Sequence, residues 1–200
     1  MTEATERLRA ITGLSRSART SLEPQLYTTA LTLALLAAPA PALAPRWNPK
    51  APDNAQILPA FSYATVEPVL TSIGARFQRV GTSPARPQLN VTFPNNRKAM
   101  LVMSACDPAG TACKAMSVQS YWTRIANSPP DRTARAIETF NQRYAFAKAF
   151  VAADGRPALQ RYLTADYGFV RGNLAVNLLV FASQSDQFAT QVLRPLEAAK

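Results

Sequence analysis

The sequence from Leu174 to Pro195 is LAVNLLVFASQSDQFATQVLRP, and the spacing of its large apolar residues indicates a long helix. These residues recur at intervals of 4, 7, 14 and 18 from the first of them: Leu174, Leu178, Phe181, Phe188 and Val192. The intervals place their side chains on one stripe of a helix, and such a stripe needs a sheet to cover. Asn173 is a candidate N-cap of this helix, and Pro195 is expected to end it.

The upstream sequence supplies the strands of that sheet. A first helix is expected to have Thr65 as its N-cap, to stop at Gly74 and to bury one face: Val66, Val69, Leu70 and Ile73. Apolar runs and alternation then predict three strands, at residues 76–80, 88–93 and 98–106. A fourth strand is expected where inward positions alternate: Met116, Val118, Ser120 and Trp122. The strands follow one another as an antiparallel meander.

The second half of the chain changes again from helix to strands. Asp131 follows Ser128-Pro129-Pro130 and is a candidate N-cap for a second helix, whose expected face is Ala134, Ile137, Phe140 and Tyr144. Asp154-Gly155 is a hairpin turn between strand-like runs at 150–151 and 159–163. The order α-β-β-β(-β)-α-β-β-α therefore predicts an α+β fold, in which an antiparallel sheet carries packed helices.

The front of the chain has the pattern of an export signal. Residues 26–38 are mostly Leu, Ala and Thr, a length typical of the apolar region of a signal peptide and short for a membrane span. The small-residue rule predicts cleavage between Ala42 and Leu43. The first 25 residues are longer and less positive than usual, with four Arg offset by three Glu. An uncleaved anchor, a soluble N-terminal helix and a start codon assigned too far upstream remain alternatives.

We therefore expect three parts: a signal peptide at 1–42, a Pro-rich tether at 43–60 and a single α+β domain at 61–197. A cleaved signal predicts a periplasmic or secreted protein. Contact with a membrane is expected only through the signal segment, if it stays uncleaved.

The two cysteines fit an oxidising compartment. Cys106 and Cys113 flank a six-residue stretch that contains two turn formers, and they lie between strand-like runs. A disulfide that closes this small loop is expected after export. The alternative is a pair of reduced, buried thiols in a cytosolic protein.

The residues offer little for catalysis. The chain contains no His, which excludes Ser-His-Asp and Cys-His catalysis, and two Cys alone fall short of the four ligands of a structural zinc site. Its 7 Gly lack the spacing of a phosphate-binding loop, so neither a cofactor nor a metal is expected. Asp154 and Asp166 are the nearest candidates for a carboxylate pair, but a turn residue and a strand-end residue explain them more simply. A non-enzymatic protein is expected.

The charge belongs to the folded part of the chain. Residues 45–200 carry 18 Lys and Arg against 9 Asp and Glu. Such an excess suits nucleic acid, an anionic membrane face or an acidic protein, or it keeps a small domain soluble. Because the basic residues are scattered and form no dense run, we favour the soluble surface, and nucleic acid is not the expected partner.

A set of residues between about 63 and 193 has the pattern and spacing of a known family: Val66, Leu70, Gly74, Phe77, Cys106, Cys113, Ile137, Phe140-Asn141, Arg143-Tyr144-Ala145, Ala147-Lys148-Ala149-Phe150, Asp154-Gly155, and Asp166 near Gly168 and Gly172. By these residues the chain resembles the YbjN family, bacterial proteins described as sensory transduction regulators. It departs from the family at Phe140, where members tend to have Trp, and at Glu138, where they tend to have Asn.

The resemblance implies a fold similar to that of type III secretion chaperones and membership of an exported subgroup that carries the Cys pair. It also implies a protein or peptide partner, in a regulatory or chaperone-like role. Secretion chaperones are typically dimeric, so the resemblance is compatible with a homodimer but leaves the oligomeric state open. We therefore expect a non-enzymatic, exported protein of the cell envelope. The alternative is a cytosolic regulator that uses its basic surface on nucleic acid or on an acidic partner.

Overall fold

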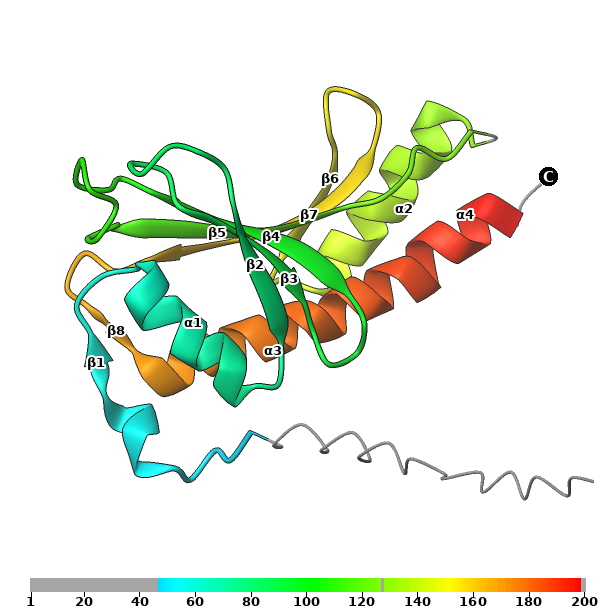
Figure 1. Ribbon diagram of the computed structural model, residues 1–200. Helices are drawn as coiled ribbons and strands as arrows, with labels where there is room; N and C mark the ends of the chain where they lie inside the picture. The colour runs from blue at the N-terminus through cyan, green and yellow to red at the C-terminus, as the bar shows by residue number, and fades with distance from the viewer. Residues whose placement is uncertain (1–46, 127, 199–200) are drawn as a thin grey trace, which may run out of the picture. The chain divides into compact units, whose positions relative to one another are not determined.

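A six-stranded antiparallel sheet carries three main helices in the computed structural model, which describes residues 47–126 and 128–198 (Figure 1). The strands lie in the order β2-β3-β4-β5-β7-β6, with the bounds β2 Arg76–Val80, β3 Gln88–Thr92, β4 Lys98–Ser104, β5 Ala115–Tyr121, β6 Lys148–Val151 and β7 Pro157–Thr164. The helices are α1 Tyr63–Ser72, α2 Pro130–Arg143 and α3 Arg171–Phe188. The predicted α+β fold and the order of its main elements are confirmed, with the fourth strand of the meander present.

The sheet has one covered face and one open face. Leu89, Leu101 and Val118 lie opposite one another in neighbouring strands on the covered face, and each is at most 1% exposed. The helices α1 and α3 pack there, and the rings of Phe93 and Phe181 are 6.3 Å apart. Burial of one such Leu or Phe side chain stabilises the fold by about 1.5–3 kcal/mol. The covered face is therefore the core that holds the helices in place.

Helix α1 begins three residues earlier than the sequence indicates. Ser62 is the N-cap, and its hydroxyl accepts from the main-chain N–H of Thr65 at 3.3 Å. Thr65 returns the bond, because its hydroxyl accepts from the N–H of Ser62 at 2.9 Å. The prediction of Thr65 as N-cap is wrong, since this residue is the inner member of a capping box. The predicted face is buried.

Helix α2 also begins earlier than predicted. It starts at Pro130, so that Asp131 lies in its first turn and Pro129 occupies the N-cap position. Ala134 is exposed, and Thr133 is buried in its place, with its hydroxyl 3.0 Å from that of Ser128. The predictions of Asp131 as N-cap and of Ala134 as a core residue are therefore wrong, because the Pro129-Pro130 pair starts the helix.

The predicted apolar stripe is confirmed. Its first four residues lie in α3 and the last lies in the turn that follows, and all are at most 5% exposed: Leu174, Leu178, Phe181, Phe188 and Val192. The two predicted ends of the helix are wrong. The helix starts at Arg171, so Asn173 lies inside it, and Pro195 lies inside the continuation α4 (Arg194–Ala198). A π-helical turn, η2 (Ala189–Leu193), precedes this proline. Because Pro has no N–H to donate, a widened turn before it lets the helical path continue.

Short elements before α1 add to the domain. Residues 52–58, which the sequence places in the Pro-rich tether, form a 3-10 helix, η1 (Pro52–Ala55), and a strand, β1 (Ile57–Leu58). Strand β1 pairs with β8 (Phe169–Val170), and Leu58 is 5% exposed. The side chains of Asp53 and Arg171 form an ion pair beside this strand pair.

The predictions for the front of the chain concern other residues. The apolar run at 26–38, the cleavage position between Ala42 and Leu43 and the first part of the tether lie outside the described residues. Among the residues that the structure describes, no helix has the length and apolar character needed to span a bilayer.

Candidate functional site

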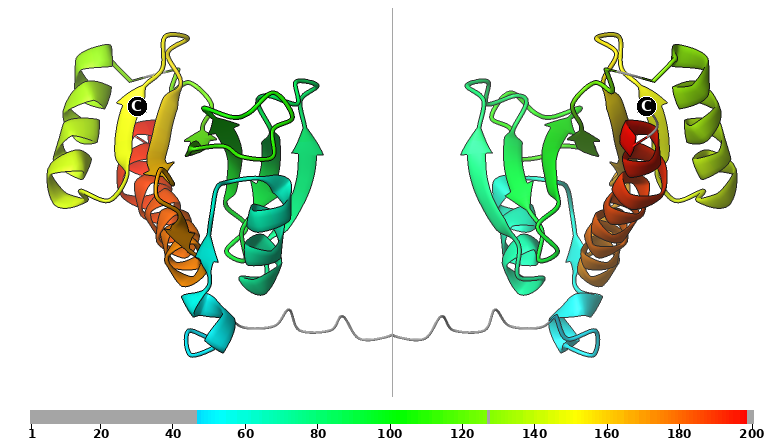
Figure 2. Two further views of the ribbon diagram at one scale, coloured as in Figure 1. Left: turned by 90° about the vertical axis from the view of Figure 1, so that its left-hand side faces the viewer. Right: turned by 90° about the vertical axis from the view of Figure 1, so that its right-hand side faces the viewer.

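A groove of about 780 Å³ runs over the open face of the sheet. One row of side chains crosses this face through four neighbouring strands: Asn90, Met100, Gln119 and Gln160. The views in Figure 2 place α2 on the outer side of β6 and β7, away from β2–β4. The first three residues of the row line the groove, together with side chains from β2. The groove therefore offers amide groups and an apolar thioether on a surface made of strands.

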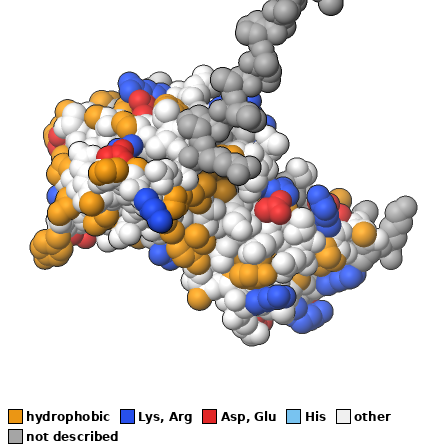
Figure 3. Space-filling view, turned by 90° about the horizontal axis from the view of Figure 1, so that it is seen from below, with side chains coloured by type: hydrophobic (Ala, Val, Ile, Leu, Met, Phe, Trp, Pro, Cys, Tyr) orange, Lys and Arg blue, Asp and Glu red, His pale blue; other side chains and the backbone are white. Residues whose placement is uncertain are grey.

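The groove is basic. Its lining includes Arg76, Lys98 and Arg156 and contains no Asp or Glu. Among the described residues, neither Arg76 nor Lys98 makes an ion pair. The helix side differs, because Arg79 pairs with Glu67 there and Arg97 pairs with Asp186. Figure 3 shows that side, with acidic and basic side chains next to one another. Arg76 and Lys98 are thus two groove cations without a counter-charge, a feature that they share with basic residues elsewhere in the described chain, such as Arg132 and Arg135 on α2.

Arg156 forms one end of the groove from the turn between β6 and β7. Its guanidinium lies 4.9 Å from the ring centre of Tyr121 and donates from Nε to Asp154 at 2.7 Å. The main-chain N–H of Arg156 and then its guanidinium lower the pKa of the Asp154 carboxyl. Asp154 is therefore the turn residue that the sequence predicts, and it holds Arg156 over the groove wall.

The structure does not bring Asp154 and Asp166 together. They lie at opposite ends of the eight-residue strand β7, which at about 3.3 Å per residue separates them by roughly 26 Å. A carboxylate pair for glycoside hydrolysis needs a separation below about 10 Å. Within the described part of the chain, no group of three or more Cys, Asp or Glu side chains is placed to hold a metal ion.

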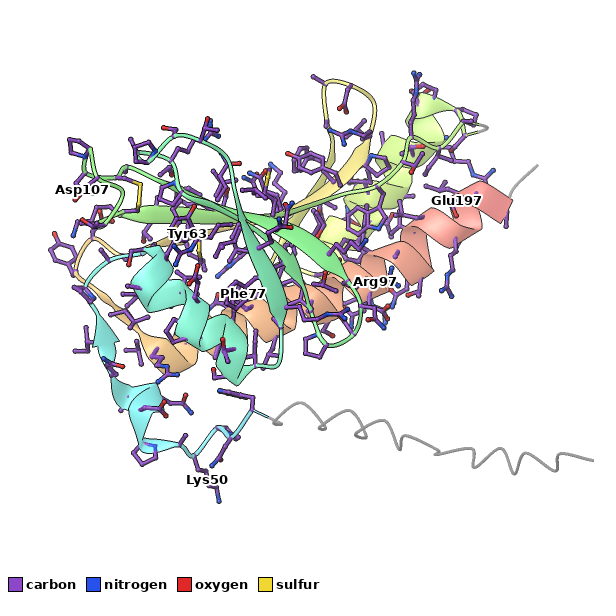
Figure 4. The ribbon with its side chains drawn as sticks, viewed as in Figure 1. Lys50, Tyr63, Phe77, Arg97, Asp107 and Glu197 are labelled. Atoms are coloured by element: carbon purple, nitrogen blue, oxygen red, sulfur yellow. A yellow bond between two sulfur atoms is a disulfide. The ribbon has the colours of Figure 1, made fainter. Side chains whose placement is uncertain are left out.

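The predicted pair Cys106 and Cys113 is joined in a disulfide at the end of the sheet. The main chain of Cys113 exchanges two hydrogen bonds with that of Phe61, at 2.9 and 3.0 Å, so the loop also holds the segment before α1. Inside the loop, Asp107 accepts from the hydroxyl of Thr111 and from the N–H of Ala112, and these bonds lower the pKa of its carboxyl. Figure 4 shows Asp107 beside the disulfide, far from Glu197.

The disulfide loop also reaches the loop between β2 and β3. Gly110 has a φ of +71°, and a Cβ added there would overlap the carbonyl oxygen of Pro84. This close approach requires glycine. The loop therefore contacts both the segment before α1 and the loop that follows β2.

The sequence alone does not single out the row formed by Asn90, Met100, Gln119 and Gln160. Each member alternates with a buried apolar residue of its strand, as Asn90 does with Leu89 and Val91. This alternation indicates an outward face, but only the register of four strands shows that these outward residues are neighbours. The register also places the unpaired cations at positions 76 and 98 on either side of Thr92.

The chain is similar to a known protein family and to a solved structure. Residues 62–194 match the model of the YbjN family, which is described as "Putative bacterial sensory transduction regulator". The match runs from the N-cap of α1 to the first residue of α4. No curated protein matches the chain. A solved structure of an uncharacterized protein from Methanothermobacter thermautotrophicus is similar over 68% of this chain and 99% of that chain, at 12% identity and a TM-score of 0.44.

Proposed function

Because the chain belongs to the YbjN family, whose members are described as regulators, we propose that it is a non-enzymatic regulatory protein of the bacterial cell envelope. In this proposal an acidic segment of a protein partner occupies the groove on the open face. The groove's unpaired cations and its lack of acidic residues are the observation on which the proposal depends.

The chemistry of the groove suits a protein partner. The amides of Asn90 and Gln119 can each donate and accept, as a peptide main chain requires, and the half-buried Met100 offers an adaptable apolar contact. Arg76 and Lys98 lie on either side of Thr92 in neighbouring strands, so both can meet carboxylates of one segment. Charge complementarity of this kind speeds association and selects acidic partners.

Export is the second part of the proposal. A disulfide that closes a short surface loop is typical of proteins that fold in an oxidising compartment, and Cys106 and Cys113 form such a loop. In this proposal the apolar run at 26–38 belongs to a signal peptide that directs export, and cleavage between Ala42 and Leu43 removes it. The protein is therefore proposed to act in the periplasm or outside the cell, starting at Leu43.

A cytosolic regulator that binds nucleic acid is the second candidate, because the same unpaired cations suit phosphate groups. Single strands usually stack their bases on exposed aromatic rings beside such cations. The ring of Tyr121, which lines the groove, already lies under the guanidinium of Arg156. This arrangement favours the protein partner.

A photo-crosslinking amino acid at position 90 tests the proposal in the native bacterium. Asn90 is exposed within the groove, and Glu138, exposed on α2, is the matched control position. We expect position 90 alone to yield an adduct with an acidic envelope protein. The adduct should disappear with Arg76→Glu and Lys98→Glu combined, and it should persist with Arg132→Glu and Arg135→Glu, which reverse two exposed charges on α2.

Three results would contradict the proposal. An adduct that persists with Arg76→Glu and Lys98→Glu would show that the groove is not the binding site. An adduct with nucleic acid would support the second candidate. Full-length protein in the cytosol with both thiols free would refute export. Intact mass of the protein from its native host, with and without reductant, reads the cleavage position and the thiol state together.

A further inference from the structure

A small pocket of about 230 Å³ lies beside the groove, where β4 begins and β5 ends. Its lining brings together the turn before β4, the two strand ends named above and the last turn of α3: Asn96, Arg97, Lys98, Tyr121, Trp122 and Ser185. Lys98 and Tyr121 also line the groove. A ligand in the groove can therefore place one of its groups in this pocket.

Ser185 lines the pocket and has a buried hydroxyl. The residue is 1% exposed, and its Oγ makes no hydrogen bond to any of the described residues. A buried hydroxyl without a partner is unfavourable, and most buried polar groups in folded proteins are paired. The pocket is nevertheless larger than a single water, which takes about 30 Å³ of liquid volume. It has room for a group of several heavy atoms that would accept from Ser185.

The walls of the pocket supply further donors. Arg97 donates from Nε at 3.0 Å and from Nη2 at 2.5 Å to one oxygen of Asp186, while its Nη1 bonds to no described residue. Lys98 makes no ion pair within the described part of the chain. The free donors are thus an ammonium, one guanidinium nitrogen and a hydroxyl. A carboxylate, with two oxygens and a negative charge, matches this set better than a neutral group does.

Asn96 and two aromatic residues complete the walls, and the two rings are held in place. The ring of Trp122 packs against that of Phe188, with centroids 5.1 Å apart, and the hydroxyl of Tyr121 donates to Gln119 at 3.1 Å. Side chains held by packing and hydrogen bonds keep a site in shape without a ligand, which lowers the entropy cost of binding. The pocket is therefore preformed.

We propose that this pocket binds the carboxylate of one Glu or Asp side chain of the partner, with Lys98, Arg97 Nη1 and Ser185 Oγ as its donors. The inference rests on the proposed function, because it names the group by which a segment in the groove is recognised. The pocket would set specificity, since an amide in the same place offers one oxygen and no charge. A difference of about tenfold or more between acid and amide is expected from charge-assisted hydrogen bonds.

The tryptophan in the wall provides the measurement. The chain has 2 Trp, so Trp47→Phe leaves Trp122 as the reporter of the pocket. We would titrate purified Trp47→Phe protein with N-acetylglutamate α-amide and with N-acetylglutamine α-amide, which differ only in the side-chain carboxylate. A saturable change in Trp122 fluorescence is expected, with the glutamate compound binding at least about tenfold more tightly.

Variants of the donors complete the test. Lys98→Met should abolish the preference for the acid, and Ser185→Ala should weaken binding of the acid by about threefold to tenfold. Lys148→Met is the matched control, because Lys148 lies opposite Gln160 on the same face but does not line the pocket. It should bind like the parent.

The outcomes separate the two proposals. Equal binding of the acid and the amide would overturn the inference, and so would a preference for the acid that survives both Lys98→Met and Ser185→Ala. Either result would mean that the pocket holds only water. Neither would affect the proposed function, which the crosslink at position 90 tests. If the pocket prefers the acid but the crosslink at position 90 does not depend on charge, the carboxylate site is supported and the groove is not the binding site of the partner.

Discussion

Asn141 in α2 bonds to both main-chain groups of Ala149 in the edge strand β6. Its Nδ2 donates to the carbonyl oxygen at 2.9 Å, and its Oδ1 accepts from the N–H at 2.8 Å. Two residues earlier, just before β6 begins, the N–H of Ala147 donates to the side-chain oxygen of Gln184 in α3 at 3.0 Å. Edge strands expose unpaired groups that recruit other chains. Two side chains therefore take the place of a further strand at this edge.

Replacement of Asn141 by Leu should destabilise the protein by about 2 kcal/mol, because two hydrogen bonds are lost and the groups of Ala149 are left without their partner. Unfolding in urea measures the change. Gln142→Ala, one position along on the exposed side of α2, is the control and should stay within about 0.5 kcal/mol of the parent. An equal loss in both variants would contradict this role for Asn141.

Reduction of the disulfide should also lower stability. Cys106 and Cys113 are 7 positions apart, and the chain-entropy estimate for a loop of this size is about 2–3 kcal/mol. The double variant Cys106→Ser and Cys113→Ser should show this loss, and reductant should change the parent but leave the variant unaffected. Identical urea midpoints for the parent with and without reductant would refute the prediction.

Asp107 should make stability depend on pH in acid. Its pKa is lower in the folded protein than in the unfolded chain, because Thr111 and Ala112 donate to the carboxylate. The ionised Asp107 carboxylate therefore contributes its full stabilisation above the pKa of the unfolded chain, about 4. This stabilisation is lost as the pH falls through the lower pKa of the folded protein. The difference in melting temperature between the parent and Asp107→Asn should shrink below pH 4. A difference that stays constant from pH 7 to pH 2 would exclude this linkage.

The stripe of α3 should dominate the core. Phe181 is fully buried against Phe93, so Phe181→Ala should cost about 3–5 kcal/mol through lost burial and the cavity left behind. Val176 in the same helix is 42% exposed, and Val176→Ala should cost much less. Urea unfolding of the two variants measures both. Similar losses would show that the stripe does not anchor the helix.

Glycine at position 110 should be required where the disulfide loop meets Pro84. Gly110→Ala adds a Cβ that overlaps the Pro84 carbonyl, at a residue whose φ is +71°. We expect a loss of stability with the disulfide still formed, as seen by intact mass. Gly81→Ala, which also has a positive φ but meets only the flexible side chain of Gln88, is the control and should lose less.

The sequence by itself determined the order of the main elements and most of the core. The periodic apolar residues of α3, the alternation about Leu89 and the Asp154-Gly155 turn each lie in one continuous stretch, where the pattern and the structure it specifies coincide. The pairing of Cys106 with Cys113 belongs to the same class, because a short loop brings the two sulfur atoms together.

The helix ends depended on more than a local pattern. Thr65, Asp131 and Asn173 all favour N-cap positions, yet the helices begin earlier, at Tyr63, Pro130 and Arg171. The backbone that leads into each helix decides where it begins, and that path is set by contacts such as the pairing of β1 with β8 before α3. A capping residue inside the first turn is compatible with an earlier start, so residue type alone does not choose.

Only the tertiary structure decided the candidate site. The groove depends on the register of four strands, and the pocket joins Lys98, Trp122 and Ser185 from three separate stretches of the chain. A polar residue such as Ser185 reads in sequence as one more position of a helix, and its missing partner becomes apparent only when its neighbours are placed around it. Local patterns report what a segment buries, whereas a binding site is made by what distant segments leave unpaired.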